Sequence, residues 1–267
     1  MRHPATVPPM AELSAPPSWR TVDFISDLHL NADEPATFSA WQHYLQHTPA
    51  DAVFILGDLF EVWVGDDAAS ADLPAPAQAS FENSCAQVLA EAGRRLALFF
   101  MHGNRDFLVG PAFMDACHAS LLDDPTVLTF AGQRWLLSHG DALCLDDLDY
   151  MAFRQQVRSA GWQCAFLAQP LAERQALARE MRRQSEARKQ SGMDYADVDT
   201  EAARQWLKAA CAFTLIHGHT HKPALHDLGD GLSRVVLSDW DAQASMPRAQ
   251  VLRLDASGLQ RIALLSA

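Results

Sequence analysis

The stretch TVDFISDLH spans residues 21–29, and it joins a strand pattern to two side chains that bind metals. The run from Thr21 to Ser26 is largely apolar and β-branched, which predicts a buried strand. Asp27 and His29 follow at positions i and i+2, and in an extended backbone this spacing points both side chains to one side. Carboxylate and imidazole groups are good ligands for divalent metals. The stretch therefore predicts a strand that ends in a cation site.

Four later fragments repeat this combination of acidic, amide or imidazole side chains, mostly beside glycine, and at least four of the five directly follow an apolar, strand-like run. The four are Gly57-Asp58, Gly103-Asn104-Arg105-Asp106, Ser138-His139-Gly140-Asp141 and His217-Gly218-His219-Thr220-His221. A lone Asp-x-His or His-x-His is weak evidence, because it can be a loop with satisfied hydrogen bonds. Five such fragments in one chain predict a two-metal hydrolytic site.

Strand and helix patterns alternate along much of the chain, which is typical of a layered α/β core. Strands are expected at residues 21–26, 52–56, 96–101, 127–130, 134–137, 213–216, 235–237, 250–254 and 260–265. Helices are expected at 36–47, 79–92 and 111–116, and a loop at 74–76. The double acid Asp66-Asp67 is interpreted as a turn.

The segment from Asp146 to Ala210 breaks this rhythm, because it is largely helical and contains no convincing strand. Between Arg174 and Lys189 it carries six of the chain's 21 basic residues, with apolar residues before and among them: Arg174, Arg179, Arg182, Arg183, Arg188 and Lys189, with Leu171, Leu177, Ala178 and Met181. On an arbitrary helix this pattern indicates a solvated amphipathic face. In an acidic chain with a metal site, it favours a helical cap over an anionic, partly apolar ligand.

Composition limits the remaining choices. The chain has 267 residues and 49% hydrophobic content, enough for one large domain or one domain with an insertion. A net charge of −12 disfavours non-specific binding to nucleic acid. The five cysteines are scattered and form no CxxC pair, which indicates a reduced compartment.

The first twenty residues contain five prolines and little apolar periodicity, so residues 1–20 are predicted to be a disordered leader. They lack the features of a secretory signal. No run approaches the roughly 18–20 apolar residues that span a bilayer. We therefore expect a cytoplasmic protein, and this is compatible with contact at a membrane surface.

The order and content of the five fragments resemble the calcineurin-like metallophosphoesterase superfamily, whose pattern is DxH, GD, GN-H/R-D/E, H and GHxH. The resemblance runs from about Thr21 to the C-terminus. It implies a layered α/β/β/α sandwich over residues 21–267, with a helical cap inserted at about 146–210. It assigns a first metal to Asp27, His29, Asp58 and His221, and a second to Asp58, Asn104, His139 and His219. His217 falls outside this set and is interpreted as local support.

Two cations that share Asp58 would lower the pKa of a bridging water and neutralise phosphoryl oxygens. No GxSxG motif or isolated Cys/His arrangement competes as a source of a covalent nucleophile. Arg105 stands where many members of the superfamily have histidine. A guanidinium stays protonated and cannot act as a general acid, but it can bind a phosphate through two hydrogen bonds. Arg105 therefore favours a diphosphate substrate, whose leaving group is itself a phosphate.

The longer strings GDLFEVWVGDD, HGNRDFLVG, SHGDALCLDD and IHGHTHKPALH are similar to members of the superfamily that act in lipid A biosynthesis. This similarity implies two Mn²⁺ ions and attack of water on the α-phosphorus of a UDP-linked diacylated glucosamine, releasing UMP and a diacylated sugar 1-phosphate. It implies catalytic roles for Asp58, Asn104, Arg105 and His219. It implies substrate contacts by Asn104, Arg105, Asp147, Ser185, Lys189 and His219.

The similarity also implies a cap that holds two acyl chains and a peripheral position on the cytoplasmic face of the inner membrane. One departure concerns the cap, where a lysine expected near Ser191 or Gly192 is absent and Lys189 is expected to replace its charge. Two alternatives stay open. One is another enzyme of the superfamily, such as a nucleotide phosphodiesterase or a DNA exonuclease subunit. The other is a non-catalytic scaffold that has lost its metals.

Overall fold

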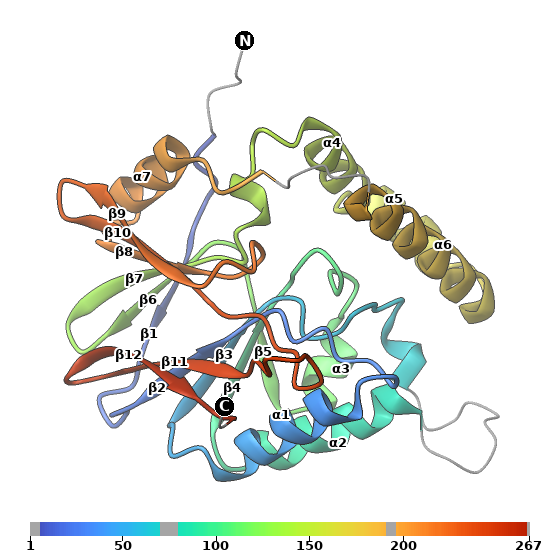
Figure 1. The fold of residues 1–267 in the computed structure, drawn as a ribbon, viewed down its shortest axis with the longest axis horizontal. Helices are drawn as coiled ribbons and strands as arrows, with labels where there is room; N and C mark the ends of the chain where they lie inside the picture. The colour runs from blue at the N-terminus through green and yellow to red at the C-terminus, as the bar shows by residue number, and fades with distance from the viewer. Residues whose placement is uncertain (1–5, 70–79, 191–195, 266–267) are drawn as a thin grey trace.

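Two six-stranded sheets packed face to face form the centre of the molecule (Figure 1). The computed structural model describes residues 6–69, 80–190 and 196–265, with the backbone alone at residues 182 and 184–190. The first sheet has the order β12-β11-β2-β3-β4-β5, and the second has the order β1-β6-β7-β8-β10-β9. Helices lie outside both sheets, so the predicted layered α/β/β/α sandwich is confirmed.

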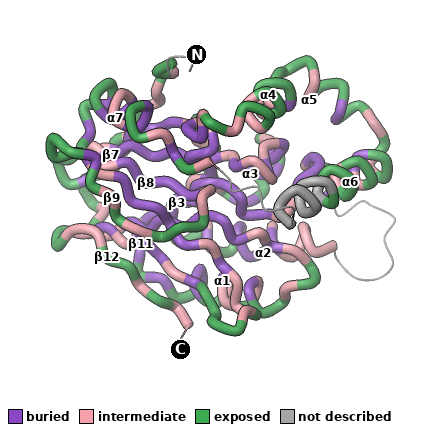
Figure 2. Tube along the Cα trace, turned by 45° about the horizontal axis from the view of Figure 1, so that its top comes forward, coloured by how far each residue is buried: buried purple, intermediate pink, exposed green. Residues whose placement is uncertain are grey.

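The first sheet contains the strands that deliver three of the five fragments. Its strands are β2 (Val22–Ile25), β3 (Ala52–Leu56), β4 (Ala97–Met101), β5 (Ala119–Leu122), β11 (Gln250–Asp255) and β12 (Gly258–Ala263). The pairs β2-β3, β3-β4 and β4-β5 are parallel, so these strands end at the same edge. Every residue of β2 and β3 is buried, as expected for parallel strands covered on both faces (Figure 2).

The second sheet delivers the other two fragments. Its strands are β1 (Ala11–Ser14), β6 (Thr126–Phe130), β7 (Gln133–Leu137), β8 (Thr214–His217), β9 (Ala224–Gly229) and β10 (Leu232–Val236). Strands β7 and β8 are parallel, so the fragments that follow them also meet at one edge. Between the sheets, Phe54 stacks on Phe24 and Phe99 at ring separations of 5.3 and 4.7 Å.

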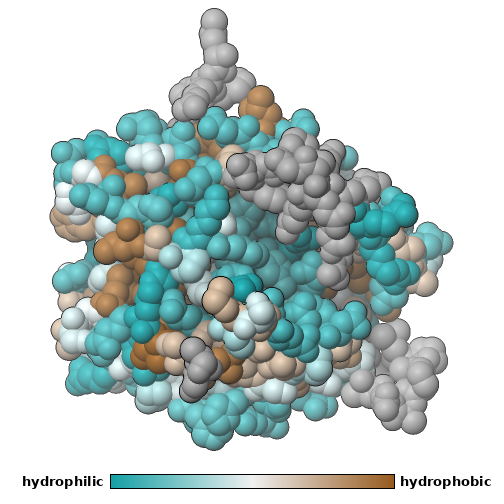
Figure 3. All heavy atoms as spheres, in the orientation of Figure 1, coloured by the Kyte–Doolittle hydropathy of each residue, from teal (hydrophilic) through white to brown (hydrophobic). Residues whose placement is uncertain are grey.

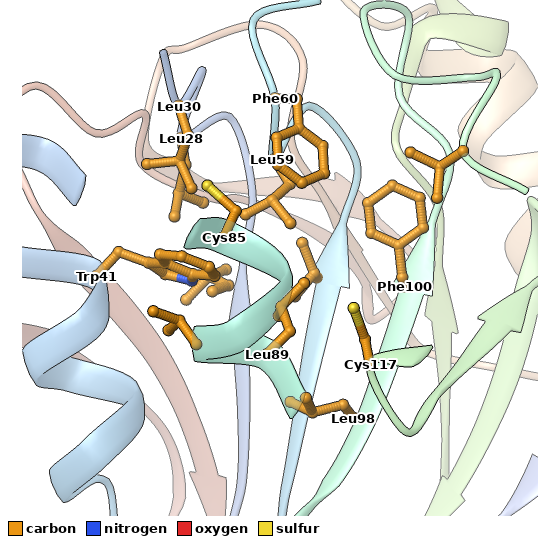
Figure 4. Close-up of a cluster of buried hydrophobic side chains, with 14 of the residues drawn as sticks. Leu28, Leu30, Trp41, Leu59, Phe60, Cys85, Leu89, Leu98, Phe100 and Cys117 are labelled. Atoms are coloured by element: carbon orange, nitrogen blue, oxygen red, sulfur yellow. The ribbon is translucent and has the colours of Figure 1, made fainter. Parts of the chain in front are cut away.

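Helices α1 (Pro35–His47), α2 (Phe81–Gly93) and α3 (Pro111–Ala116) cover the outer face of the first sheet. Proline at the first turn of α1 and α3 fits a position that needs no N–H donor. The Ser80 hydroxyl caps α2 by accepting from the backbone N–H of Asn83. Figure 4 shows the apolar cluster beneath these helices, where Trp41, Leu89 and Phe100 pack with residues from the fragments themselves.

The cap is an arm of three helices, α4 (Leu148–Val157), α5 (Ala160–Leu167) and α6 (Leu171–Gln190) (Figure 1). The predicted boundary of about 146–210 is wrong at its C-terminal side, because α7 (Thr200–Ala209) belongs to the sandwich. Its Trp206 and Leu207 are buried against Leu136 and Leu215 of the second sheet. The helical pattern of α7 is indistinguishable from that of a cap helix, and only the tertiary contacts separate the two.

Other expectations also need correction. The predicted disordered leader is wrong for residues 11–14, which form β1, pair in parallel with β6 and contribute Leu13 to the inter-sheet cluster. The pattern did not predict β5 or β9, both strands at the ends of their sheets. The double acid opens a 3-10 helix, η1 (Asp66–Ala69), and a second one, η2 (Asp141–Leu143), follows β7. The expected loop at 74–76 and residues 1–5 lie outside the described residues.

Within the part of the chain that the structure describes, no helix is both long enough and apolar enough to cross a membrane.

Replacing Trp206 with alanine tests the assignment of α7 to the sandwich. Because the indole is 4% exposed and packs on the second sheet, Trp206→Ala is expected to lower the free energy of unfolding by about 3–5 kcal/mol. Phe213→Ala is a matched control, since that ring is 69% exposed, and a change within about 0.5 kcal/mol is expected. Urea unfolding of the metal-free proteins measures both. Equal losses in the two variants would contradict the assignment.

Candidate metal centre

The five fragments converge where the strands end. Backbone strain is concentrated there: nine non-glycine residues of the described chain have positive φ, and five of these are predicted metal ligands. The five are Asp27, His29, Asp58, His219 and His221. Left-handed backbone is unfavourable for residues that carry a Cβ atom, and such strain clusters at functional sites.

Glycine beside the ligands allows the loops to approach one another closely. A Cβ atom on Gly57 would collide with the His139 ring, and one on Gly103 would collide with the Asp58 carboxylate. Gly57 also has a φ of 88°, which favours glycine. The Gly-Asp and Gly-Asn pairs in the sequence are therefore explained by close packing of one loop on the next.

The first group of predicted ligands comprises Asp27, His29 and His221, whose ligand atoms lie within 4.8 Å of one another. The Nε2 atoms of His29 and His221 are 3.2 Å apart, and the latter is 3.3 Å from Asp27 Oδ1. On the other side of the His29 ring, Nδ1 lies 2.9 Å from Glu61 Oε2. Leu28 and Leu30 alternate with these ligands and point into the core (Figure 4).

The second group joins Asp58, Asn104, His139 and His219. Asn104 Oδ1 lies 3.0 Å from His139 Nε2 and 2.8 Å from His219 Nδ1. Asp58 Oδ2 lies 3.8 Å from His139 Nε2 and 4.0 Å from His29 Nε2, so this oxygen stands between the two groups. Its position suits the predicted shared carboxylate. Asp27 also comes close enough to form a cluster with Asp58 and His139.

The donor set fits a cation. His139 Nδ1 must donate to the backbone carbonyl of Leu56, 2.9 Å away, so in the neutral ring the Nε2 lone pair faces Asn104 Oδ1. His29 likewise has its Nδ1 beside a carboxylate, which leaves its Nε2 lone pair facing His221. Fixing one ring nitrogen so that the other can bind a metal is a recurrent feature of metal sites.

The pKa values of the two histidines of the second group move in opposite directions. Burial alone lowers the pKa of His139, but Asp58, Asp141 and Asp27 outweigh it and raise that pKa to about 9. Burial, together with the charge on His139, lowers the pKa of His219 to about 4. In the metal-free chain a proton on His139 therefore takes part of the role of a cation, and metal binding must release it.

Asp106 holds two of the loops together. Its fully buried carboxylate accepts hydrogen bonds from the backbone N–H groups of Gly103, Asp58, Leu59 and Phe60 at 2.8, 3.2, 2.7 and 3.4 Å. Burial and the charge of Asp58 raise the pKa of Asp106 to about 7. The fourth member of the Gly-Asn-Arg-Asp fragment thus fixes the loops that carry Asp58 and Asn104.

Arg105 lies at the entrance of the site and is 17% exposed. Its backbone N–H donates to Asp58 Oδ1 at 2.8 Å, and its Nη1 lies 3.6 Å from Glu61 Oε1. Glu61 thus contacts both His29, a predicted metal ligand, and Arg105, the side chain predicted to bind phosphate. Sequence reasoning passed over Glu61, because nothing in its spacing distinguishes it from other acids after the second fragment.

His217, which was predicted to lie outside the ligand set, has its ring nitrogens directed at other groups. Its Nδ1 donates to the Gly218 carbonyl at 2.9 Å, and its Nε2 is 3.4 Å from Arg234 Nη1. A Cβ atom on Gly140 would collide with its ring. The ring is therefore packed against the fourth and fifth fragments rather than between the ligand groups.

Apart from Arg105, the predicted substrate contacts outside the ligand set fall in the cap. Asp147 caps α4, accepting from the backbone N–H of Tyr150 at 3.0 Å. The side chains of Ser185 and Lys189, and the whole of residues 191 and 192, lie outside the described residues. The roles of these residues stay predictions.

Polar contacts that the sequence analysis did not predict fasten the cap to the sandwich. Tyr150 and Arg154 of α4 both donate to Asp141 Oδ2, at 2.5 and 2.8 Å. Arg174 of α6 is buried and pairs with Asp67 of the double acid. The i, i+4 spacing of Tyr150 and Arg154 was the available signal, but no pattern indicated which acid they would meet.

Comparison with known protein sequences agrees with the predicted family. A family model described as calcineurin-like phosphoesterase matches residues 20–223. UDP-2,3-diacylglucosamine hydrolase of Chromobacterium violaceum is 46% identical over 252 residues, covering 91% of this chain and 98% of that protein. The protein of that name from Xanthomonas oryzae pv. oryzae is 43% identical over 252 residues, covering 90% and 97%. The solved structure of an archaeal phosphodiesterase has a TM-score of 0.44 at 12% identity, covering 91% of this chain and 99% of that one.

Replacing Asp106 with asparagine tests its role in positioning the ligand loops. Asn keeps the shape but lacks the second acceptor oxygen, so Asp106→Asn is expected to weaken divalent-metal affinity by about 10–100-fold. Asp66→Asn is the control, because Asp66 also accepts backbone N–H groups, from Gly110 and Phe113, but supports α3 instead. Calorimetric titration with Mn²⁺ compares them. Similar metal affinity in the two variants would argue against the positioning role.

Proposed function

The chain belongs to the calcineurin-like phosphoesterase family, and from this membership we propose that it hydrolyses the diphosphate of UDP-2,3-diacylglucosamine. Water attacks the α-phosphorus, and the products are UMP and 2,3-diacylglucosamine 1-phosphate, an intermediate of lipid A biosynthesis. The observation that carries this proposal is the 43–46% identity to hydrolases named for that substrate over about nine-tenths of the chain, which includes the cap.

The cofactor in this proposal is a pair of Mn²⁺ ions, one in each ligand group. Four of the seven predicted ligands are imidazoles, namely His29, His139, His219 and His221. Imidazole ligands disfavour Mg²⁺, which prefers oxygen ligands and keeps its waters; the choice of Mn²⁺ among the transition metals follows from the resemblance to the family. The position of Asp58 Oδ2, about equally far from His29 and His139, supports a pair rather than a single ion.

The chain's residues then act by position and charge. Bound divalent cations supply a water of lowered pKa and neutralise phosphoryl oxygens. Arg105 binds the diphosphate through its guanidinium, and the leaving phosphate needs no proton from it. Glu61 aligns Arg105 with His29 by contacting both. Asn104 Oδ1 and His219 Nδ1 lie 2.8 Å apart and belong to the second ligand group.

The cap accounts for the acylated part of the substrate. Its three helices line an open apolar hollow of about 330 Å³, within the range of about 300–1,000 Å³ typical of ligand sites. We call this space the hollow; it is lined by Phe153, Gln156, Val157, Trp162, Ala165, Phe166, Gln169, Leu177 and Met181. Figure 3 shows hydrophilic residues lining a recess between the sandwich and the cap. A polar recess beside an apolar hollow suits a substrate with a nucleotide diphosphate and acyl chains.

Incubation with UDP-2,3-diacylglucosamine and Mn²⁺, followed by chromatographic detection of UMP, tests the proposal. Wild-type protein is expected to release UMP. Asp58→Ala is expected to abolish turnover, because it removes the carboxylate between the two ligand groups. Cleavage of a simple phosphodiester without release of UMP would favour another phosphoesterase. Binding of Mn²⁺ without any hydrolysis would favour a non-catalytic scaffold.

We further propose that the enzyme lies on the cytoplasmic face of the inner membrane as a peripheral protein, because its acylated substrate resides in a bilayer. Several apolar cap residues are exposed, among them Leu148 at 73% and Leu177 at 45%. Such side chains can enter the boundary between headgroups and acyl chains.

Sedimentation with phospholipid vesicles tests this location. The wild-type protein is expected to pellet with vesicles, and Leu148→Ser is expected to reduce the pelleted fraction about twofold or more, because it removes apolar area from the membrane-facing side. Leu225→Ser is the matched control, since Leu225 is 71% exposed on β9 of the sandwich. Wild-type protein that stays in the supernatant, or equal effects of both substitutions, would contradict the proposed attachment.

A further inference from the structure

Helix α4 lies between the hollow and the loops that carry the predicted metal ligands, and one of its faces contacts each of them. Tyr150, Arg154 and Arg158 recur at intervals of four residues and therefore share one face, which meets the ligand loops. Phe153 and Val157 share another face, which lines the hollow.

The first face is tied to the loop that carries His139. Tyr150 Oη and Arg154 Nε donate to the same oxygen of Asp141, at 2.5 and 2.8 Å. Asp141 is fully buried and follows His139 by two residues. The arginine makes one of these bonds charge-assisted, the stronger class of hydrogen bond. A displacement of α4 must therefore move Asp141 or break both bonds.

The same face also reaches two other ligand loops. The Tyr150 ring stacks on the His219 ring, with centroids 5.8 Å apart and an interplanar angle of 29°. Arg158 donates to the carbonyl of Gly103, the residue before Asn104, at 2.7 Å. Three of the five ligand loops thus contact one helix of the cap.

The second face of α4 is incompletely packed. Within α4, all ten residues of which the structure describes, Val157 is the one buried residue. Phe153 is 36% exposed, and across the hollow Met181 is exposed to the same extent. The helix is therefore fastened by polar contacts on the side of the ligand loops, and on the other side it leaves apolar surface accessible to a ligand in the hollow.

We propose that α4 couples occupancy of the hollow to the geometry of the metal centre, with Tyr150 and Arg154 as positioning residues. An alkyl chain that packs on Phe153 and Val157 stabilises the position of α4 in which its other face holds the three ligand loops. A ligand shifts a conformational equilibrium by its differential affinity for the two states. The alkyl chain and the metal therefore both favour the state in which α4 holds the three ligand loops. The identity of the natural ligand as an acyl chain rests on the proposed function; the coupling does not.

The consequence for the reaction is that the acyl chains act on the chemical step. Binding energy from a remote part of a substrate can raise kcat when it is used to align the reacting groups. Coupling between two binding sites is reciprocal, so the metal must also tighten binding of the alkyl chain by the same factor.

Calorimetric titration of the full chain with Mn²⁺, with and without saturating 1-decanol, tests the coupling without any substrate. 1-Decanol carries no phosphate and no charge, so it cannot ligate the metals as a product would. The Mn²⁺ dissociation constant is expected to fall about fivefold or more when 1-decanol is bound. The 1-decanol dissociation constant, followed by tryptophan fluorescence, is expected to fall by the same factor when Mn²⁺ is bound.

Variants of α4 separate coupling from simple packing. Arg154→Met is expected to remove the effect of 1-decanol on Mn²⁺ affinity. Tyr150→Phe is the milder second variant, because it keeps the ring on His219 and loses only the bond to Asp141, and it is expected to reduce the effect by half or more. Gln155→Ala is the matched control on the exposed side of the same helix, and it is expected to retain the full effect.

Three outcomes of the titrations would overturn the proposal: unchanged Mn²⁺ affinity with 1-decanol bound, an undiminished effect in Tyr150→Phe, or failure of 1-decanol to bind.

Kinetics supply a second test. Removal of both acyl chains from the nucleotide sugar is expected to lower kcat of the wild type about tenfold or more and to have a smaller effect on kcat in Tyr150→Phe. An effect confined to KM would contradict the coupling. If UDP-2,3-diacylglucosamine is not a substrate at all, the titrations with 1-decanol still decide the coupling.

Discussion

The structure depends on bringing carboxylate, amide and imidazole lone pairs together in one buried space. Asp27, Asp58 and His139 are all nearly inaccessible to water, and charged or lone-pair groups that face one another there are unfavourable without a positive charge between them. The raised pKa of His139 is a direct result, because a proton on this ring offsets the negative charge of the nearby carboxylates. Divalent cations relieve the same repulsion more fully, so folding of the loops and binding of metal stabilise each other.

Local backbone features follow from this requirement. Loops from five different strands can meet only if their backbones approach closely, so glycine stands beside the predicted ligands at Gly57, Gly103 and Gly218. Two of the predicted ligands, Asp27 and Asp58, adopt left-handed backbone, and that strain must be offset by contacts elsewhere. Asp106 supplies such contacts through its bonds to backbone N–H groups, and the buried leucines between the ligands anchor the loops in the core.

Sequence reasoning predicted the parts of this arrangement that have local causes. Buried parallel strands read as apolar runs, such as AVFIL at residues 52–56, and the ligands follow them directly. It failed where tertiary contacts decide. The β1 segment AELS is too short and polar to be recognised without its partner β6, and α7 is distinguished from the cap only by what Trp206 contacts. The bonds of Tyr150 and Arg154 to Asp141, like the pairing of Glu61 with Arg105, join segments whose relation no spacing encodes.

The cap combines buried polar attachments with an open apolar surface. Its polar attachments are partly or fully buried and involve arginine: Arg154 meets Asp141 at its beginning, and Arg174 meets Asp67 at the start of its longest helix. After the cap, Arg234 pairs with Asp197 at 2.8 Å and also contacts His217, beneath the fifth fragment. Removing one partner of such a pair leaves a buried charge unpaired, so these attachments resist displacement. The apolar surface between them is left open to an adaptable ligand. A rigid attachment beside the ligand loops and an open apolar surface on the other face of the same helix suit a lipid-linked diphosphate, because its reacting phosphorus must be held still while its chains vary.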